Sequence, residues 1–96
     1  MSAAAPDSGP AAGAGLTLLM REECELCEQM GAALASLARR VALPAVARAD
    51  VDSDPQWQRR YGLQVPVLLL DGTPVCRTRL DESELLSALR RRGDRL

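Results

Sequence analysis

The chain has 96 residues, of which 47% are hydrophobic and 26% are charged, and its formal net charge is −1. This size and composition predict a single globular domain with a thin core. The near-neutral charge, with one Trp and one Tyr, argues against a surface that binds nucleic acid or anionic lipid. Three cysteines make a poor disulfide framework for a secreted protein, and no apolar run approaches the ~20 residues that cross a bilayer. We therefore expect a soluble, cytoplasmic protein.

Residues 1–15 are predicted to form a disordered N-terminal tail. They consist mainly of Ala, Gly, Pro and Ser, with one acidic residue and no basic one. They therefore lack both the charged start and the apolar stretch of a secretory signal peptide. The predicted folded domain spans residues 16–93.

The first half of this domain has the pattern of a strand, a helix and a strand. Leu16–Met20 is a short apolar run after a glycine, which is typical of a strand buried on both faces. Apolar residues then recur at steps of three and four, which predicts an amphipathic helix over about Cys24–Arg40. Pro44 ends this helix, and Ala45–Val51 is the second predicted strand. The apolar stripe of the helix consists of Met30, Leu34, Leu37, Ala38 and Val41.

A short helix and a hairpin are expected next. Asp54-Pro55 supplies an N-cap and a proline at the first helical position, and Gly62 suits the C′ position where this helix ends. The apolar run Val65–Leu70 then meets Asp71-Gly72, a strong short-range signal for a two-residue hairpin. Pro74 in the returning strand places that strand at a sheet edge, where a missing N–H is tolerated.

The last predicted helix has signals at both ends. Asp81 and Glu84 have the spacing of a capping box, and Leu80 and Leu85 that of a hydrophobic staple. Gly93 closes the helix after a basic run. In the resulting order, a right-handed crossover makes the first two strands parallel and the hairpin adds antiparallel partners. The expected fold is an α/β sandwich with a four-stranded mixed sheet.

Cys24 and Cys27 form a Cys-x-x-Cys pair at the start of the first helix. Cysteines at this spacing can close a small disulfide loop, and the first sulfur can lie where unpaired N–H groups and the helix dipole favour a thiolate. Cys24 is the expected nucleophile, and Cys27, one turn further and less exposed, the expected resolving thiol. A pair in this context, followed by Val65-Pro66 ahead of a strand, predicts thiol–disulfide exchange through a redox-active disulfide.

Over nearly all of residues 16–92 the chain resembles small bacterial glutaredoxin-like proteins of the thioredoxin superfamily. The matching segments are Cys24-Glu25-Leu26-Cys27, Val51–Pro55, Arg60–Val67 and Asp71-Gly72. The resemblance implies a thioredoxin-like βαβαββα fold and a disulfide oxidoreductase.

The resemblance also implies a substrate-binding surface. Pro66 would be a cis-proline facing the dithiol, and the backbone of Val65 would pair with a bound peptide or glutathione. Arg21, three residues before the first cysteine, would bind the glycine carboxylate of glutathione.

Two departures from glutaredoxins concern glutathione. Glu25-Leu26 stands where glutaredoxins typically carry Pro-Tyr, so the aromatic side chain that lines the glutathione groove is missing. Of the Gly-Gly-x-x-Asp-like turn before the last helix, only the acid, Asp81, is present. These departures weaken the case for glutathione as the reductant, and no bound cofactor is expected.

Four carboxylates surround the predicted dithiol, and Arg21 opposes them: Glu22, Glu23, Glu25 and Glu28. Their charge should disfavour a thiolate, against the effect of the helix dipole. A disfavoured thiolate stabilises the disulfide and lowers the reduction potential. We therefore expect a reductant rather than an oxidant.

The same cysteines permit a second interpretation. A structural zinc site needs about four Cys or His ligands, and three cysteines with no histidine do not supply them within one chain. As a dimer, however, the chain can share a zinc ion or an iron–sulfur cluster through Cys24 and Cys27, or act as a non-enzymatic binding module. Cys76 has the pattern of a small buried hydrophobe.

The preferred interpretation is a monomer. Its expected partners are a protein or small-molecule disulfide and a reductase or glutathione, without nucleic acid, membrane or metal.

Overall fold

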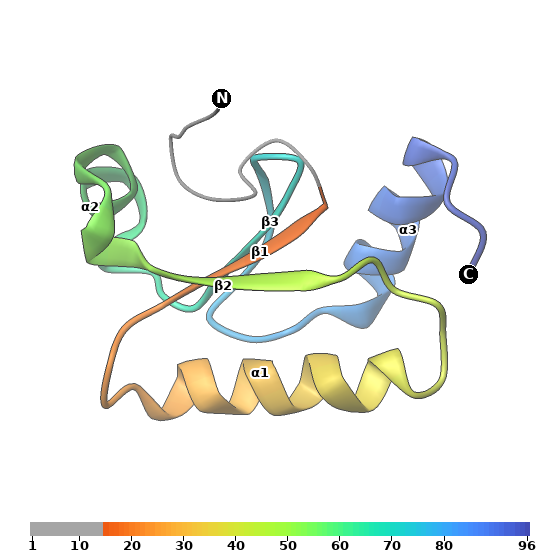
Figure 1. Ribbon diagram of the computed structural model, residues 1–96, viewed down its shortest axis with the longest axis horizontal. Helices are drawn as coiled ribbons and strands as arrows, with labels where there is room; N and C mark the ends of the chain where they lie inside the picture. The colour runs from red at the N-terminus through yellow and green to blue at the C-terminus, as the bar shows by residue number, and fades with distance from the viewer. Residues whose placement is uncertain (1–14) are drawn as a thin grey trace.

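The computed structural model describes residues 15–96, and these residues form the predicted order of strands and helices (Figure 1). A short 3-10 turn, η1, is the element that no sequence signal predicted. The tail predicted for residues 1–15 lies outside the described residues except for Gly15. No helix within residues 15–96 is long and apolar enough to cross a membrane. In chain order the elements are β1 (Leu16–Met20), α1 (Glu25–Ala38), β2 (Val46–Asp50), η1 (Val51–Ser53), α2 (Pro55–Tyr61), β3 (Val67–Leu70), β4 (Thr73–Arg77) and α3 (Glu82–Arg92).

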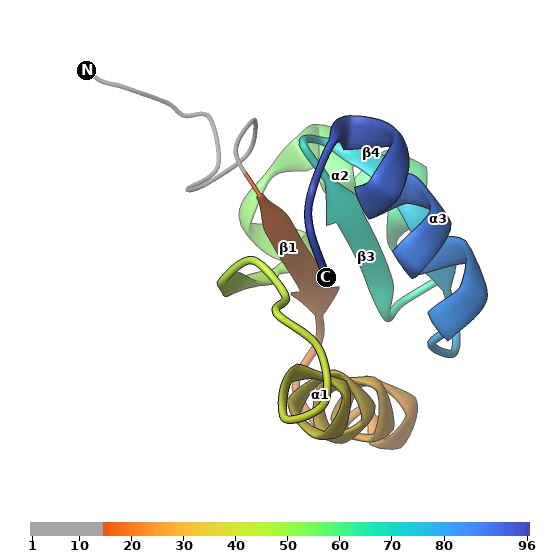
Figure 2. The ribbon, with the colours of Figure 1, turned by 90° about the vertical axis from the view of Figure 1, so that its right-hand side faces the viewer.

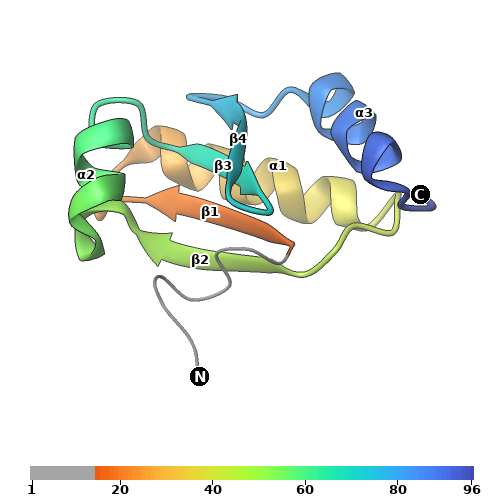
Figure 3. The same ribbon diagram turned by 90° about the horizontal axis from the view of Figure 1, so that it is seen from above.

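The strands form one mixed sheet in the order β2-β1-β3-β4, which confirms the expected thioredoxin-like fold. β1 is parallel to β2, with Met20 opposite Asp50, and antiparallel to β3, with Leu19 opposite Val67. The carboxyl ends of β1 and β2 therefore lie beside the start of β3, at one end of the sheet (Figure 3). The loop that leads from β1 to Cys24 and the loop that carries Pro66 both lie at this end.

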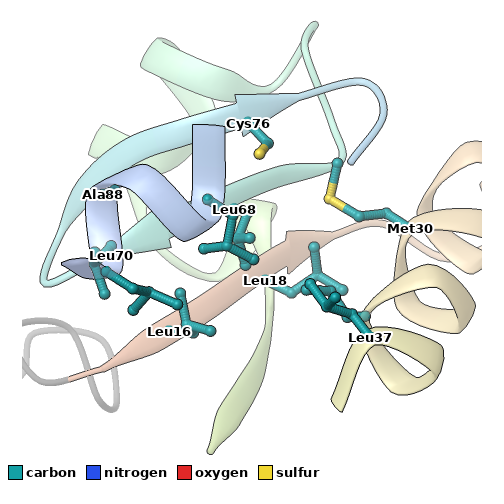
Figure 4. Packing of buried hydrophobic residues seen from close by; sticks show 11 residues of the cluster. Leu16, Leu18, Met30, Leu37, Leu68, Leu70, Cys76 and Ala88 are labelled. Atoms are coloured by element: carbon teal, nitrogen blue, oxygen red, sulfur yellow. The ribbon is translucent and has the colours of Figure 1, made fainter. Parts of the chain in front are cut away.

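The core has two parts because β1 is buried on both faces. Leu16 and Leu18 face the side covered by α1 and α3, in a cluster that includes Met30 and Leu68 (Figures 2 and 4). Leu19 faces the other side, and the residues packed with it there come from η1, α2 and β3: Val51, Tyr61, Val67 and Leu69. Helices on both faces hold the sheet, and with it the site, in place.

One residue of the predicted helix stripe is placed differently. Ala38 is exposed although it follows the buried Leu34 by four residues and lies on the same side of α1, and it is the last residue of that helix. Gly31 takes a buried position instead. A Cβ atom at Gly31 would lie 3.2 Å from the guanidinium of Arg48, so the side chain of Arg48 on β2 reaches across to this side of α1.

The hairpin follows the sequence signals. Asp71 and Gly72 have φ angles of 51° and 85°, as the two central residues of a type I′ turn require. β4 is an edge strand and contains Pro74, as predicted. The register shifts between Leu68 and Leu69, so that Val75 has no partner across the pair and forms a bulge.

The ends of α3 have the predicted N-cap and terminal glycine, but within the described residues no bond from the N–H of Asp81 to the Glu84 carboxylate completes the capping box. Asp81 is the N-cap, and its carboxylate accepts the backbone N–H of Glu84 at 3.0 Å. Gly93 has a left-handed φ of 103° and closes the helix, with its N–H donated to the carbonyl of Arg90 at 2.9 Å. Leu80 packs against the same core cluster as Leu85.

Replacing Asp81 with Ala should lower the free energy of unfolding by about 1 kcal/mol, because the N–H of Glu84 loses its acceptor. Urea unfolding followed by circular dichroism measures the change. Ser83→Ala is the matched control: it lies in the same turn, leaves the cap intact and should change stability by less than about 0.5 kcal/mol. Equal losses in the two variants would show that the cap does not stabilise α3.

Candidate dithiol active site

Cys24 and Cys27 are joined by a disulfide at the start of α1, with their Cα atoms 5.2 Å apart. Cys24 is the N-cap of the helix, with extended backbone angles, and its Sγ accepts the N–H of Cys27 at 3.1 Å. A Ser or Asp oxygen usually has this role. After reduction, the same N–H would stabilise a thiolate on Cys24, because a helix start favours negative charge.

The two sulfur atoms differ in their access to solvent. Cys24 is half-buried, whereas Cys27 is completely buried among the residues of the core. A reagent in solution can therefore reach Cys24 before it reaches Cys27. Leu26, between them, is 43% exposed and extends the surface around Cys24 with an apolar side chain.

The loop before β3 forms the second part of the site. The Val65–Pro66 peptide bond is cis, as the family resemblance implies. Pro66 is buried and Val65 is half-buried. Within residues 15–96, neither the N–H nor the C=O of Val65 forms a hydrogen bond. This backbone edge is therefore unpaired among the described residues, at the same end of the sheet as Cys24.

The segment after β4, at Thr78, contacts the cis-proline loop. The N–H of Thr78 is donated to the carbonyl of Pro66 at 2.7 Å, and Thr78 has a left-handed φ of 71°. This region costs a β-branched residue on the order of 1–2 kcal/mol.

Arg21, a predicted substrate-binding residue, makes three contacts within the chain. Its Nε and Nη2 donate to the two carboxylate oxygens of Asp52, each at 2.9 Å. Its Nη1 donates to the carbonyl of Gly62 at 2.7 Å. The Arg21 guanidinium holds the pKa of the Asp52 carboxyl below its usual range. Three of the five N–H groups are engaged in this way, and a contact with substrate stays a prediction.

The four glutamates of the predicted acidic rim are all exposed. Three of them line a cleft of about 570 Å³ that opens between the dithiol loop, α1 and β2: Glu22, Glu23 and Glu28. Arg48 lines the same cleft, although no sequence signal brought it to the site. Water in the cleft screens these charges, so their effect on Cys24 is weaker than a direct contact would be.

Within the described residues, no group of three or more His, Cys, Asp or Glu side chains is placed to hold a metal ion. Cys76 is a free thiol in the core, and its Sγ lies 3.6 Å from the carbonyl oxygen of Asp81. Burial raises the pKa of the Cys76 thiol. Its position confirms the interpretation of Cys76 as a buried hydrophobe.

Comparison with known proteins connects this geometry to a family. Residues 15–90 match the model of the glutaredoxin-like domain (DUF836). A protein from X. campestris, XcR50, is 32% identical, with a TM-score of 0.61, and the match covers 79% of this chain and 96% of that one. Protein Ne2328 from Nitrosomonas europaea is 25% identical, with a TM-score of 0.69 and coverages of 85% and 98%.

A thioredoxin from Halobacterium salinarum is also similar. It is 27% identical, with a TM-score of 0.52, and the match covers 84% of this chain and 75% of that one. No curated protein matches the sequence. The family model covers most of the described chain and includes both cysteines and the cis-proline, so the chain belongs to the glutaredoxin-like domain family.

Proposed function

We propose that the protein is a thiol–disulfide oxidoreductase that reduces disulfides by exchange at Cys24 and Cys27. The observation that carries the proposal is the position of Cys24, whose Sγ caps α1 by accepting the N–H of Cys27 at 3.1 Å. That position favours a thiolate and leaves it accessible. The unpaired N–H and C=O of Val65 lie at the same end of the sheet. They can form hydrogen bonds with the backbone of a substrate next to its disulfide.

The proposed exchange of the dithiol with a substrate disulfide has two steps. The Cys24 thiolate attacks one sulfur of the substrate disulfide, the substrate S–S bond breaks, and the departing thiolate takes a proton from water. Cys27 then loses its proton and attacks the Cys24 sulfur of the mixed disulfide, which releases the second substrate thiol. Two electrons pass from the dithiol to the substrate, and the Cys24–Cys27 disulfide is the oxidised product. A reductase or a small thiol such as glutathione restores the dithiol.

We favour a protein disulfide over glutathione disulfide as the substrate. Leu26 is 43% exposed beside Cys24, and Leu63, in the loop that leads to Val65, is fully exposed at 103%. Exposed leucines at this end of the sheet suit a partner that also presents apolar side chains. Glutathione offers none, and its net negative charge is repelled by the glutamates. The cytoplasm, where thiols are kept reduced, is the compartment that suits a reductant.

Cys24→Ser should abolish reduction of a disulfide-bonded protein such as insulin, because the nucleophile is lost. Cys27→Ser should instead accumulate a mixed disulfide with the substrate, because nothing resolves it. Insulin turbidity and mass spectrometry of the trapped adduct measure the two effects. Cys76→Ala, which removes the third cysteine, is the control and should retain exchange. If Cys24→Ser traps the mixed disulfide and Cys27→Ser abolishes reduction, the assignment of roles is overturned.

A dimer purified with zinc or an iron–sulfur cluster, whose cysteines resist alkylation, would overturn the proposed function.

The double variant Glu25→Gln/Glu28→Gln should ease ionisation of Cys24, because two carboxylates near its sulfur are neutralised. The pH profile of alkylation should move toward acid by less than about one pH unit, since exposed charges interact through water. The reduction potential should rise, because a favoured thiolate stabilises the reduced form. Both shifts should shrink in 1 M salt, where the Debye length is about 3 Å.

The matched control for this change is Glu82→Gln/Glu84→Gln at the start of α3. It alters net charge equally, but Glu82 pairs with Arg40 just beyond the far end of α1. The 14 residues of α1 separate that pair from Cys24 by about 20 Å. If Glu25→Gln/Glu28→Gln changes neither the pH profile of alkylation nor the reduction potential, the carboxylates do not affect the ionisation of Cys24.

A further inference from the structure

We propose that Arg21 is a positioning residue that ties the dithiol loop to the loop of the cis-proline, through Asp52 and Gly62. In the proposed reaction, one loop supplies the Cys24 sulfur and the other supplies the backbone edge of Val65. A substrate that touches both is attacked efficiently only if the two loops keep a fixed separation. This inference rests on the proposed function, while the tie between the loops can be measured without it.

Sheet register brings the members of this tie together. Arg21 follows the last residue of β1, and Asp52 follows the last residue of β2 by two positions, with Met20 opposite Asp50 in the parallel pair. Gly62 ends α2 and stands four residues before Pro66. All of these segments meet at the end of the sheet where the cysteines lie (Figures 1 and 3).

The contacts fix the guanidinium from two directions. Its side-on pair with Asp52 uses two parallel N–H donors, which gives a geometrically specific, charge-assisted contact. Asp52 is itself held in place, because its N–H is donated to Oδ1 of Asp50 at 2.8 Å and its Oδ1 also accepts Nε2 of Gln58 at 3.2 Å. The pKa of Asp52 lies below its usual range, so the pair is ionised at neutral pH.

Gly62 supplies the other contact. The last carbonyls of a helix lack a partner within the helix, and Nη1 of Arg21 satisfies the one at Gly62. Gly62 has a right-handed φ of −56°, so the predicted left-handed C′ position is wrong and conformational freedom is not why glycine stands there. A Cβ atom would lie 2.5 Å from the carbonyl oxygen of Gln58 and 3.4 Å from Nη2 of Arg21. The close approach to the Gln58 carbonyl leaves no room for a Cβ atom and explains the glycine, whereas the distance to Arg21 is that of an ordinary contact.

These contacts distinguish positioning from substrate binding. A carboxylate of glutathione would have to compete with Asp52, which already occupies the side-on face of the guanidinium. The positive charge is also balanced by Asp52. In this proposal Arg21 acts on the reaction through the two loops, and its role as a site for an anionic substrate is the alternative that the experiments below distinguish.

Hydrogen exchange of the full chain in its oxidised form tests the tie directly. In Arg21→Ala, the amides of Cys27 and Glu28, which are donated to Cys24, and that of Gln64, which is donated to Tyr61, should exchange several-fold faster. The amide of Leu85 in α3 should be unchanged. Arg40→Ala is the matched control, because it removes another exposed ion pair of an arginine, with Glu82, and should leave both loops unchanged. Unchanged exchange in both loops, or an even increase along the whole chain, would overturn the proposal.

Kinetics of the reduced protein test the consequence. In Arg21→Ala, kcat/KM should fall about tenfold or more for an uncharged disulfide-bonded peptide and for glutathione disulfide alike. Alkylation of Cys24 by iodoacetamide, which needs only the sulfur, should change less than about twofold. Asp52→Asn should show the same pattern more weakly, and Arg21→Ala/Asp52→Ala should be no worse than Arg21→Ala alone.

Two outcomes would count against positioning. A loss confined to glutathione disulfide would identify Arg21 as an anion-binding residue, and equal losses in alkylation and exchange would indicate damage to the sulfur environment. If the unmodified protein exchanges no disulfide at all, the proposed function fails, and the hydrogen-exchange result alone decides whether Arg21 ties the loops.

Discussion

The burial of β1 on both faces is the constraint on which the rest of the structure depends. Leu16, Leu18 and Leu19 are each at most 1% exposed, so this strand must have neighbours on both edges and helices on both faces. With β2 parallel on one edge and β3 antiparallel on the other, three loops necessarily leave the sheet at one end. The dithiol, the Asp52 turn and the cis-proline lie on those loops. The site is therefore a consequence of strand order.

Most of the fold could be predicted because its signals are local. Several elements can each be predicted from a short stretch of sequence: β1 from its apolar run, α1 from its helical stripe and the hairpin from Asp71-Gly72. Asp81 and Gly93 mark the ends of α3 by side-chain and backbone chemistry that needs no tertiary contact. The pairing of Cys24 and Cys27 belongs to the same class, because their spacing at a helix start is sufficient to bring the sulfur atoms together.

The parts of the site that were not predicted depend on contacts between distant residues. Arg21 and Asp52 are 31 positions apart, and only the register of β1 against β2 makes them neighbours. The sequence indicates a helix end at Gly62, but a glycine is needed there because the carbonyl of Gln58 leaves no room for a Cβ atom, which no pattern of residues reveals. Thr78 gives no signal at all, since a threonine is rarely placed at positive φ. A carboxylate directly after the predicted strand Ala45–Val51 is the clue that the sequence offers to Asp52.

The ion pair between Arg21 and Asp52 affects the electrostatic potential at Cys24. In the sequence, one arginine stands against four glutamates, and its charge is expected to offset theirs in part. In the structure that charge is balanced by Asp52 through a bidentate pair, so the arginine contributes little net potential at the sulfur. The helix start still acts on Cys24 directly, at 3.1 Å, whereas the exposed glutamates act through water. In the proposed function the cap therefore selects Cys24 as the nucleophile. We expect the glutamates, which are less opposed than a count of charges suggests, to shift the reduction potential of the dithiol toward the reducing side.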